Sequence, residues 1–252
     1  MTYFIAEAGV AHEGSDSMLM SLFNIAKASG CEAFKMQLYK PGTIGKNRFL
    51  PDCPVEFIQL AMEKCKEAGM DFICTPHDIW ALEQLEQQGC DLYKIGSGDW
   101  HLMDPILETC KPIIVSTGMK TWGQICKIDL PDGSGLLQCT SEYPTEPENV
   151  NLSLIFPLAE QFPHCRIGIS DHSVGIHIAL AACALGAEII EKHICLVRDS
   201  ERQDSIGACD YSEFINLVRC AREIELAIEP KEKIPTKGEL ETAEWVARRV
   251  AH

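Results

Sequence analysis

The residues of this chain that are best suited to chemistry stand at or near the ends of short apolar runs. His172 and His193 stand at or next to the ends of two such runs, and Lys35 and Lys94 lie in two others. Two imidazoles at neighbouring strand ends could share a divalent metal ion. Two lysines in the same region could bind an anion. The sequence therefore predicts one site that combines a metal with an anionic substrate.

Hydroxyl side chains accompany the two lysines and indicate a cradle for a phosphate or carboxylate group. Hydroxyls give such an anion short hydrogen bonds, and lysine gives it a point charge. A lysine in this position could instead form a Schiff base with a carbonyl substrate, and Lys94 is the candidate. Two lysines among hydroxyls are more typical of anion binding, which we therefore prefer. The hydroxyl residues are Thr75, Ser97, Ser116 and Ser170.

Eight short apolar runs recur along the chain and alternate with stretches that have helical patterns. This alternation predicts an α/β fold, a (β/α)8 TIM barrel, in which the active site lies at the C-terminal ends of the strands. The first helix is expected to begin at Asp16 as its cap and to end before Gly30. The runs are Phe4–Val10, Ala33–Tyr39, Asp71–Pro76, Leu92–Gly98, Pro112–Gly118, Gly135–Ser141, Arg166–His172 and Glu188–Ile194.

Side chains alternate between the two faces of a strand, so one parity of each run faces the lumen of the barrel. Glu7 shares its parity with Ile5, and Glu191 shares its parity with His193. We expect the inward parity to gather acids, lysines, hydroxyls and both histidines at one mouth. Glu7 or Asp204 would then complete the ligand shell of the shared metal.

Two long loops, over residues 40–53 and 198–209, follow strands and are expected on the same face of the barrel. The second loop is a plausible lid that would control the access of water. His12 and His77 are also expected near the mouth and are second-rank candidates for a role there.

Length and composition restrict the class of protein. The 252 residues fit one barrel, so we expect a catalytic domain over 1–229 and a charged tail over 230–252. The net charge of −15 disfavours nucleic acid and anionic membranes as partners. No apolar run is long enough to span a membrane, and we expect no signal peptide before the first run. The thirteen cysteines form no C-x-x-C pair, which predicts reduced thiols in a cytoplasmic protein, with Cys139 and others as small buried hydrophobes.

Seven short motifs resemble, in order, the signatures of the sialic acid synthase family. The resemblance runs from about residue 4 to residue 249. It implies a C–C bond-forming transferase that condenses phosphoenolpyruvate with an N-acylated amino sugar, usually N-acetylmannosamine, to give a nonulosonic acid and phosphate. It also implies a divalent metal, Mn²⁺ or Mg²⁺. The motifs are Ile5-Ala-Glu-Ala-Gly9, Lys35-Met-Gln37, Tyr93-Lys-Ile-Gly-Ser-Gly-Asp99, Ser116-Thr-Gly-Met119, Cys139-Thr-Ser-Glu-Tyr-Pro-Thr145, Ile169-Ser-Asp-His172 and Glu191-Lys-His193.

The resemblance assigns roles to particular residues. His172 and His193 match the metal ligands, and together with Glu7 and Lys94 they are the expected catalytic residues. Glu7 matches a glutamate that faces the reacting carbons, where it could move protons or hold water. The groups expected around phosphoenolpyruvate are Lys35, Thr75, Lys94, Ser97, Ser116 and Ser170, and those expected around the sugar are Gln37, Asp99, Tyr143 and Asp204.

The chain departs from the family pattern on the sugar side. Ala11-His12-Glu13-Gly14 replaces Asn-His-Asn-Gly, Asp99 replaces a glutamate, and Arg202-Gln203-Asp204 replaces Gly-Pro-Asp. An altered acceptor such as a diamino sugar is therefore nearly as well supported as N-acetylmannosamine. Most members of the family continue into an antifreeze-like domain that reaches over a partner subunit, and this sequence ends before it. A homodimer formed directly between two barrels is compatible with the sequence.

Two other functions compete with the synthase. One is a Schiff-base aldolase that uses Lys94, and the other is a catalytically silent barrel that binds a phosphorylated ligand. A binding barrel has no need for both metal and anion groups, so the silent barrel is disfavoured by His172, His193, Lys35 and Lys94.

Overall fold

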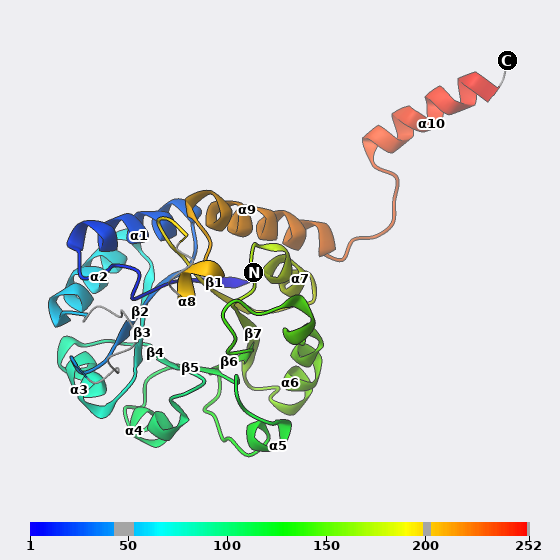
Figure 1. The fold of residues 1–252 in the computed structure, drawn as a ribbon. Coiled ribbons are helices and arrows are strands. Elements are labelled where there is room, and N and C mark those ends of the chain that lie inside the picture. The colour runs from blue at the N-terminus through cyan, green and yellow to red at the C-terminus, as the bar shows by residue number, and fades with distance from the viewer. Residues whose placement is uncertain (43–52, 199–202, 251–252) are drawn as a thin grey trace.

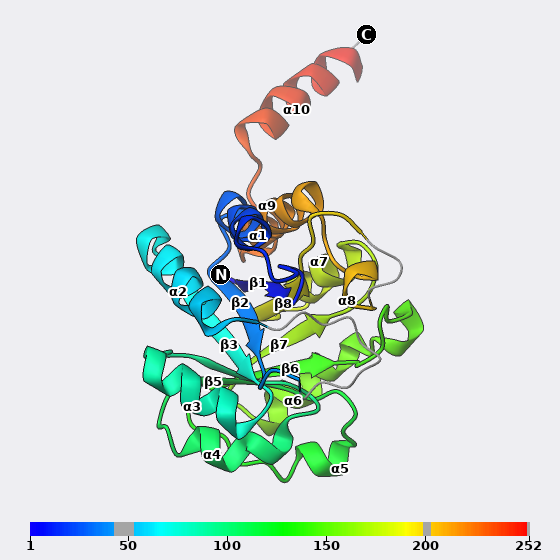
Figure 2. The same cartoon turned by 60° about the vertical axis from the view of Figure 1, so that its left-hand side comes forward.

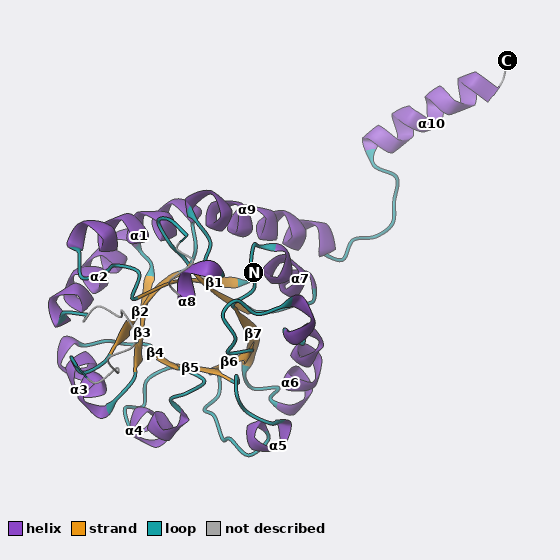
Figure 3. Cartoon of the chain, in the orientation of Figure 1, coloured by secondary structure: helices purple, strands orange, loops and turns teal. Residues whose placement is uncertain are grey.

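The computed structural model of the chain describes residues 1–42, 53–198 and 203–250. Eight parallel strands pair in sequence order, and β8 pairs with β1 to close a barrel (Figures 1 and 3). The prediction of a (β/α)8 barrel is confirmed. The strands are β1 (Tyr3–Gly9), β2 (Ala33–Leu38), β3 (Asp71–Pro76), β4 (Tyr93–Ile95), β5 (Ile113–Ser116), β6 (Gly135–Cys139), β7 (Arg166–Asp171) and β8 (Ile189–His193).

Helices form the outer layer around the ring of strands, and α8 lies at the end toward which the strands point (Figure 2). Three short 3-10 helices, η1 (Trp100–Leu102), η2 (Pro147–Asn149) and η3 (Leu152–Leu154), lie in the connections. The α-helices are α1 (Asp16–Ser29), α2 (Val55–Ala68), α3 (Ile79–Gln88), α4 (Met103–Leu107), α5 (Trp122–Ile125), α6 (Ile155–Gln161), α7 (His177–Ala184), α8 (Gln203–Ile206), α9 (Tyr211–Ile228) and α10 (Lys237–Val250).

The start of α1 differs from the sequence prediction by one residue. Ser15 is the N-cap, and its side chain accepts a hydrogen bond from Met18 N at 3.4 Å. Asp16 is instead the first helical residue, where its negative charge complements the helix dipole. The helix ends as expected at Gly30, which has the left-handed conformation that glycine adopts without strain.

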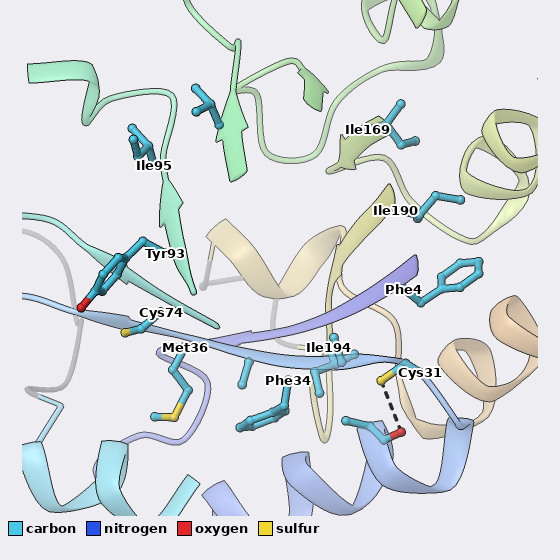
Figure 4. Close-up of a cluster of buried hydrophobic side chains, with 14 of the residues drawn as sticks. Phe4, Cys31, Phe34, Met36, Cys74, Tyr93, Ile95, Ile169, Ile190 and Ile194 are labelled. Carbon is cyan, nitrogen blue, oxygen red and sulfur yellow. Dashed lines mark hydrogen bonds between the residues drawn. The ribbon is translucent and has the colours of Figure 1, made fainter. Parts of the chain in front are cut away.

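The main core lies between the strands and the helices. Phe4, Phe34, Met36 and Ile190 point outward from the strands into this layer and are fully buried (Figure 4). A second, smaller apolar cluster fills the lumen of the barrel. Its buried members are Ile5, Ala33, Ile73, Ile114, Leu137 and Ile189.

The residues of the lumen cluster show which face of each strand points into the lumen, and therefore where the polar residues of the same parity point. Two residues further along each strand, the same parity places a polar or ionisable side chain in the next layer of the lumen. The strands run in parallel, so this second layer lies toward their C-terminal ends. The residues that follow the six members of the cluster are Glu7, Lys35, Thr75, Ser116, Cys139 and Glu191.

The charged tail forms α10, which projects away from the barrel (Figure 1). The residues of α10 are exposed, including Leu240 and Trp245. Within the described residues, no helix is both long and apolar enough to cross a bilayer.

Candidate active site

A buried ion-pair network occupies the lumen. Lys35 Nζ lies 2.5 Å from Glu7 Oε2 and 3.6 Å from Glu191 Oε2, and it donates a hydrogen bond to Thr75 Oγ1 at 3.3 Å. Burial lowers the pKa of Lys35, but the two carboxylates outweigh it and the net pKa is raised. Glu191 Oε1 accepts a hydrogen bond from Ser170 Oγ at 2.8 Å. Five strands thus bring their second-layer side chains together.

Lys94 lies in the same lumen but has different partners. Its ammonium group donates to Ser116 Oγ at 2.6 Å and to the Ile95 carbonyl at 3.2 Å. Burial lowers the pKa of Lys94 and the charge of Lys35 lowers it further; together they outweigh Glu191, whose negative charge raises it, so the net pKa is lowered. Within the described part of the chain, no carboxylate forms an ion pair with this lysine, which is 2% exposed. A desolvated ammonium group without a direct ion-pair partner favours the binding of an anion.

Ser97 and Cys139 join this cradle to the histidines. Ser97 Oγ donates to Cys139 Sγ at 3.6 Å, and that sulfur lies 3.9 Å from His172 Nδ1. Burial raises the pKa of the Cys139 thiol, but His172, Ser97 and Lys94 outweigh it and lower the pKa to about 7. Cys139 is buried, as expected for a small hydrophobe, but it is also a polar member of the site.

The two predicted histidines lie side by side, as their adjacent strands require. Their ring centroids are 5.5 Å apart, and the Tyr143 ring lies 4.2 Å from that of His172. His172 Nδ1 lies 3.0 Å from the Thr140 carbonyl, to which it donates, so Nε2 is the nitrogen that a metal would bind. Burial lowers the pKa of His172, but Cys139 and the Thr140 carbonyl outweigh it and the net pKa is raised, so a metal would have to displace the Nε2 proton. Burial lowers the pKa of His193 and favours the neutral ring that a metal binds.

The residues present fit a metal held by two imidazoles. In the described ranges, no group of three histidine, cysteine or acidic side chains could surround an ion, so the expectation that Glu7 or Asp204 completes the shell is not supported. Glu7 faces Lys35 instead. The remaining positions would fall to water or substrate oxygens. Imidazole ligands suit a transition metal better than Mg²⁺, which prefers oxygen.

Two of the residues predicted around the sugar, Gln37 and Asp99, belong to a second hydrogen-bonded group. Gln37 Nε2 donates to Glu7 Oε1 at 3.0 Å, and Asp99 Oδ2 lies 3.0 Å from His77 Nδ1. Burial raises the pKa of Asp99, but the contact with His77 outweighs it and the net pKa is lowered. Asp204, on α8, raises the pKa of His193 by its charge, although burial, the larger effect, lowers it. Asp204 lies on α8, at the end of the barrel toward which the strands point (Figure 2).

The structure brings the predicted site residues to one end of the barrel through this network. Sequence reasoning gave Glu191 no role, although its inward parity was evident. It ranked His77 second and treated Cys139 as a hydrophobe, because side-chain partners across strands leave no signal in the sequence. The predicted loops over 40–53 and 198–209 fall partly on residues 43–52 and 199–202, which lie outside the described residues.

A hollow of about 1020 Å³ opens at the opposite end of the barrel. It is lined mainly by residues at the N-terminal ends of the strands and in the C-terminal parts of α2 and α3. These residues include Met62, Phe72, Leu92 and Arg166. The ionisable cluster of the lumen does not line it. Because barrel enzymes carry their chemistry at the C-terminal ends of the strands, we assign the site to the other mouth.

Fold and site together define a class of protein: a (β/α)8 barrel with a lysine-and-hydroxyl anion cradle beside a pair of histidines. The comparison with protein families is more specific. Residues 52–233 match the profile described as the NeuB family. The chain therefore belongs to the NeuB family, which confirms the resemblance to sialic acid synthases.

Individual relatives agree with this assignment. The chain is 34% identical to an uncharacterized protein of Methanocaldococcus jannaschii, over 94% of this chain and 75% of that protein. It is 30% identical to N-acetylneuraminate-9-phosphate synthase of Homo sapiens, over 90% of this chain and 71% of that protein. It is 31% identical to N,N'-diacetyllegionaminic acid synthase of Legionella pneumophila, over 98% of this chain and 79% of that protein. A crystal structure of N-acetylneuraminic acid synthetase from Leptospira borgpetersenii superimposes with a TM-score of 0.82 at 28% identity, over 97% of this chain and 90% of that one.

Proposed function

We propose that this protein condenses phosphoenolpyruvate with an N-acylated amino sugar to give a nonulosonic acid and inorganic phosphate. Membership of the NeuB family supports this function, as do the relatives named as N-acetylneuraminate-9-phosphate and N,N'-diacetyllegionaminic acid synthases. The observation that carries the proposal is the buried ammonium group of Lys94, which donates to the Ser116 hydroxyl and forms no ion pair with a carboxylate among the described residues.

Phosphoenolpyruvate carries a phosphate and a carboxylate, and the cradle offers groups for both. Lys35 and Lys94 supply positive charge, and neighbouring hydroxyls supply hydrogen bonds. Water is largely excluded from the lumen, so these interactions are stronger than they would be at the surface. The hydroxyl residues that we assign to this role are Thr75, Ser97, Ser116 and Ser170.

Glu7 is placed to handle the protons of the reaction. Carbon 3 of phosphoenolpyruvate attacks the aldehyde carbon of the open-chain sugar, water adds to carbon 2, and the C–O bond to phosphate breaks. The water gives up two protons in these steps: one ends on the new hydroxyl of the sugar and the other on the departing phosphate. Glu7 is held between Lys35 and Gln37, where its carboxylate can orient the water or take up a proton.

We propose that His172 and His193 hold the divalent metal, Mn²⁺ in preference to Mg²⁺ because both ligands are imidazoles. When bound, the metal would act as a Lewis acid on the carbonyl oxygen of the aldehyde. Gln37, Asp99, Tyr143 and Asp204 would bind the sugar. The acceptor is N-acetylmannosamine or a related diamino sugar. We expect the enzyme to act in the cytoplasm, since all thirteen cysteines are unpaired.

A Schiff-base aldolase is a second candidate, because the lowered pKa of Lys94 is also what an amine nucleophile requires. Treatment with pyruvate and borohydride separates the two. An aldolase gains the mass of the reduced adduct on Lys94, whereas the synthase stays unmodified.

The proposal is tested by phosphate release from phosphoenolpyruvate across a panel of amino sugars, with Mn²⁺ and then with a chelator. We expect release that requires both a sugar and the metal. Binding of phosphoenolpyruvate without release for any sugar would refute the synthase and favour a silent binding barrel. Release without a sugar would indicate a phosphatase.

A further inference from the structure

His77 stands between the side chains that we assign to the sugar. Its Nδ1 lies 3.0 Å from Asp99 Oδ2, and its Nε2 lies 3.4 Å from Gln37 Oε1. Gln37 in turn donates through Nε2 to Glu7 Oε1 at 3.0 Å. A continuous chain of polar contacts therefore joins Asp99 to Glu7, and His77 is its central member.

The backbone holds His77 firmly at this position. His77 N donates to the Leu38 carbonyl at the end of β2 at 3.0 Å. The next residue, Asp78, is the N-cap of α3 and accepts from Ala81 N at 2.8 Å. The other carboxylate oxygen of Asp78 accepts from Lys40 N at 2.8 Å. The imidazole therefore projects from a segment tied to a neighbouring strand and to a helix, so that little flexibility is left for it to lose on binding.

The backbone around Asp99 leaves space for its carboxylate to reach His77. A Cβ atom at position 96 would lie only 2.4 Å from Asp99 Oδ2, so Gly96 leaves the room that the carboxylate occupies. The side chains of Asp99 and His77 are 12% and 27% exposed. Solvent thus reaches the pair from the mouth, where an acceptor sugar would arrive.

We propose that His77 is a positioning residue that orients Asp99 and Gln37 for the acceptor sugar and couples both to Glu7. This inference rests on the proposed function, since Asp99 and Gln37 are sugar ligands only under it. Lys94 and Ser116, on other strands, belong to the phosphoenolpyruvate cradle. A defect at His77 should therefore appear in the use of the sugar and leave the binding of phosphoenolpyruvate nearly unchanged.

The kinetic test uses His77→Phe, which keeps an aromatic ring but removes both nitrogens. We expect the KM for the acceptor to rise about tenfold, as for one lost hydrogen bond, while the KM for phosphoenolpyruvate changes less than twofold. His77→Asn keeps a donor near the position of Nδ1 and should recover part of the loss. The control is His164→Phe, at an exposed histidine outside the site. Equal changes in both KM values, or none, would overturn the proposal.

A second measurement does not depend on activity. The side-chain amide signals of Gln37, assigned by NMR with Gln37→Leu, should shift in His77→Phe and stay unchanged in His164→Phe. Unshifted signals would overturn the positioning role. If the wild-type protein releases no phosphate with any sugar, the proposed function fails, and the NMR result still decides whether His77 holds Gln37.

Discussion

The pair formed by Lys192 and Asp171 offers a direct test of how the two histidines are held. These residues face each other across β7 and β8, each next to a histidine of the site. Lys192 Nζ lies 2.8 Å from Asp171 Oδ2 and also donates to the Ser173 carbonyl at 2.8 Å. Both side chains of the pair are 0% exposed. The pair therefore fixes the register of the two strands on the face opposite the lumen.

Lys192→Met removes the cation and leaves the Asp171 carboxylate buried with only Ser173 as a donor. Breaking a buried ion pair on one side costs about 3–5 kcal/mol, because the remaining charge is desolvated and unpaired. For a chain of this size, such a loss lowers Tm by roughly 10 °C. Removing both charges is much less costly, so Asp171→Asn combined with Lys192→Met should recover at least about half of the loss.

Denaturant titration followed by circular dichroism measures these differences. Lys64→Met is the matched control, because Lys64 pairs with Glu67 at the surface at 2.7 Å, where an ion pair contributes roughly 0–1 kcal/mol. The reasoning is refuted if Lys192→Met costs no more than Lys64→Met. It is also refuted if the double variant is less stable than Lys192→Met alone.

Three further predictions concern the site and its surroundings. Burial lowers the pKa of His12 to about 4, so the unfolded chain binds the proton more readily and stability falls as the pH drops from about 6.5 toward 4. Roughly 2–3 kcal/mol should be lost between pH 7.5 and 4.5, and denaturation of His12→Phe should lack this component; an identical pH slope would contradict it. Lys94→Met should weaken phosphoenolpyruvate binding roughly 10- to 100-fold in calorimetry, and unchanged affinity would exclude the cradle. His172→Gln should abolish Mn²⁺ binding, measured by electron paramagnetic resonance, with an unchanged circular dichroism spectrum; wild-type affinity would contradict the histidine pair.

Some errors in the sequence analysis have local causes. Asp16 was expected to cap α1, but Ser15 does so, because adjacent residues of both types are good caps and only the backbone conformation chooses between them. Glu7 or Asp204 was expected to complete the metal shell, and the structure places Lys35, one strand away, against the Glu7 carboxylate. In both cases the residue type was suitable, and a neighbour made the better contact.

The sequence by itself determined the barrel and the set of residues that face its lumen. Alternating faces along eight apolar runs are a local property, so Ile5 predicts the direction of Glu7, and Ile189 predicts that of Glu191 and His193. The ordered motifs identified the family for the same reason, since they lie within single segments of the chain.

Only the tertiary structure decided which of these side chains meet. His77 and Asp99 are 22 residues apart, Cys139 and His172 are 33 apart, and Lys35 contacts carboxylates from β1 and β8. Such pairings depend on the stagger between strands when the barrel closes and on the rotamers that packing then allows. The charge balance around Lys94 and the pKa of Cys139 follow from those distances, and no local pattern in the chain encodes them.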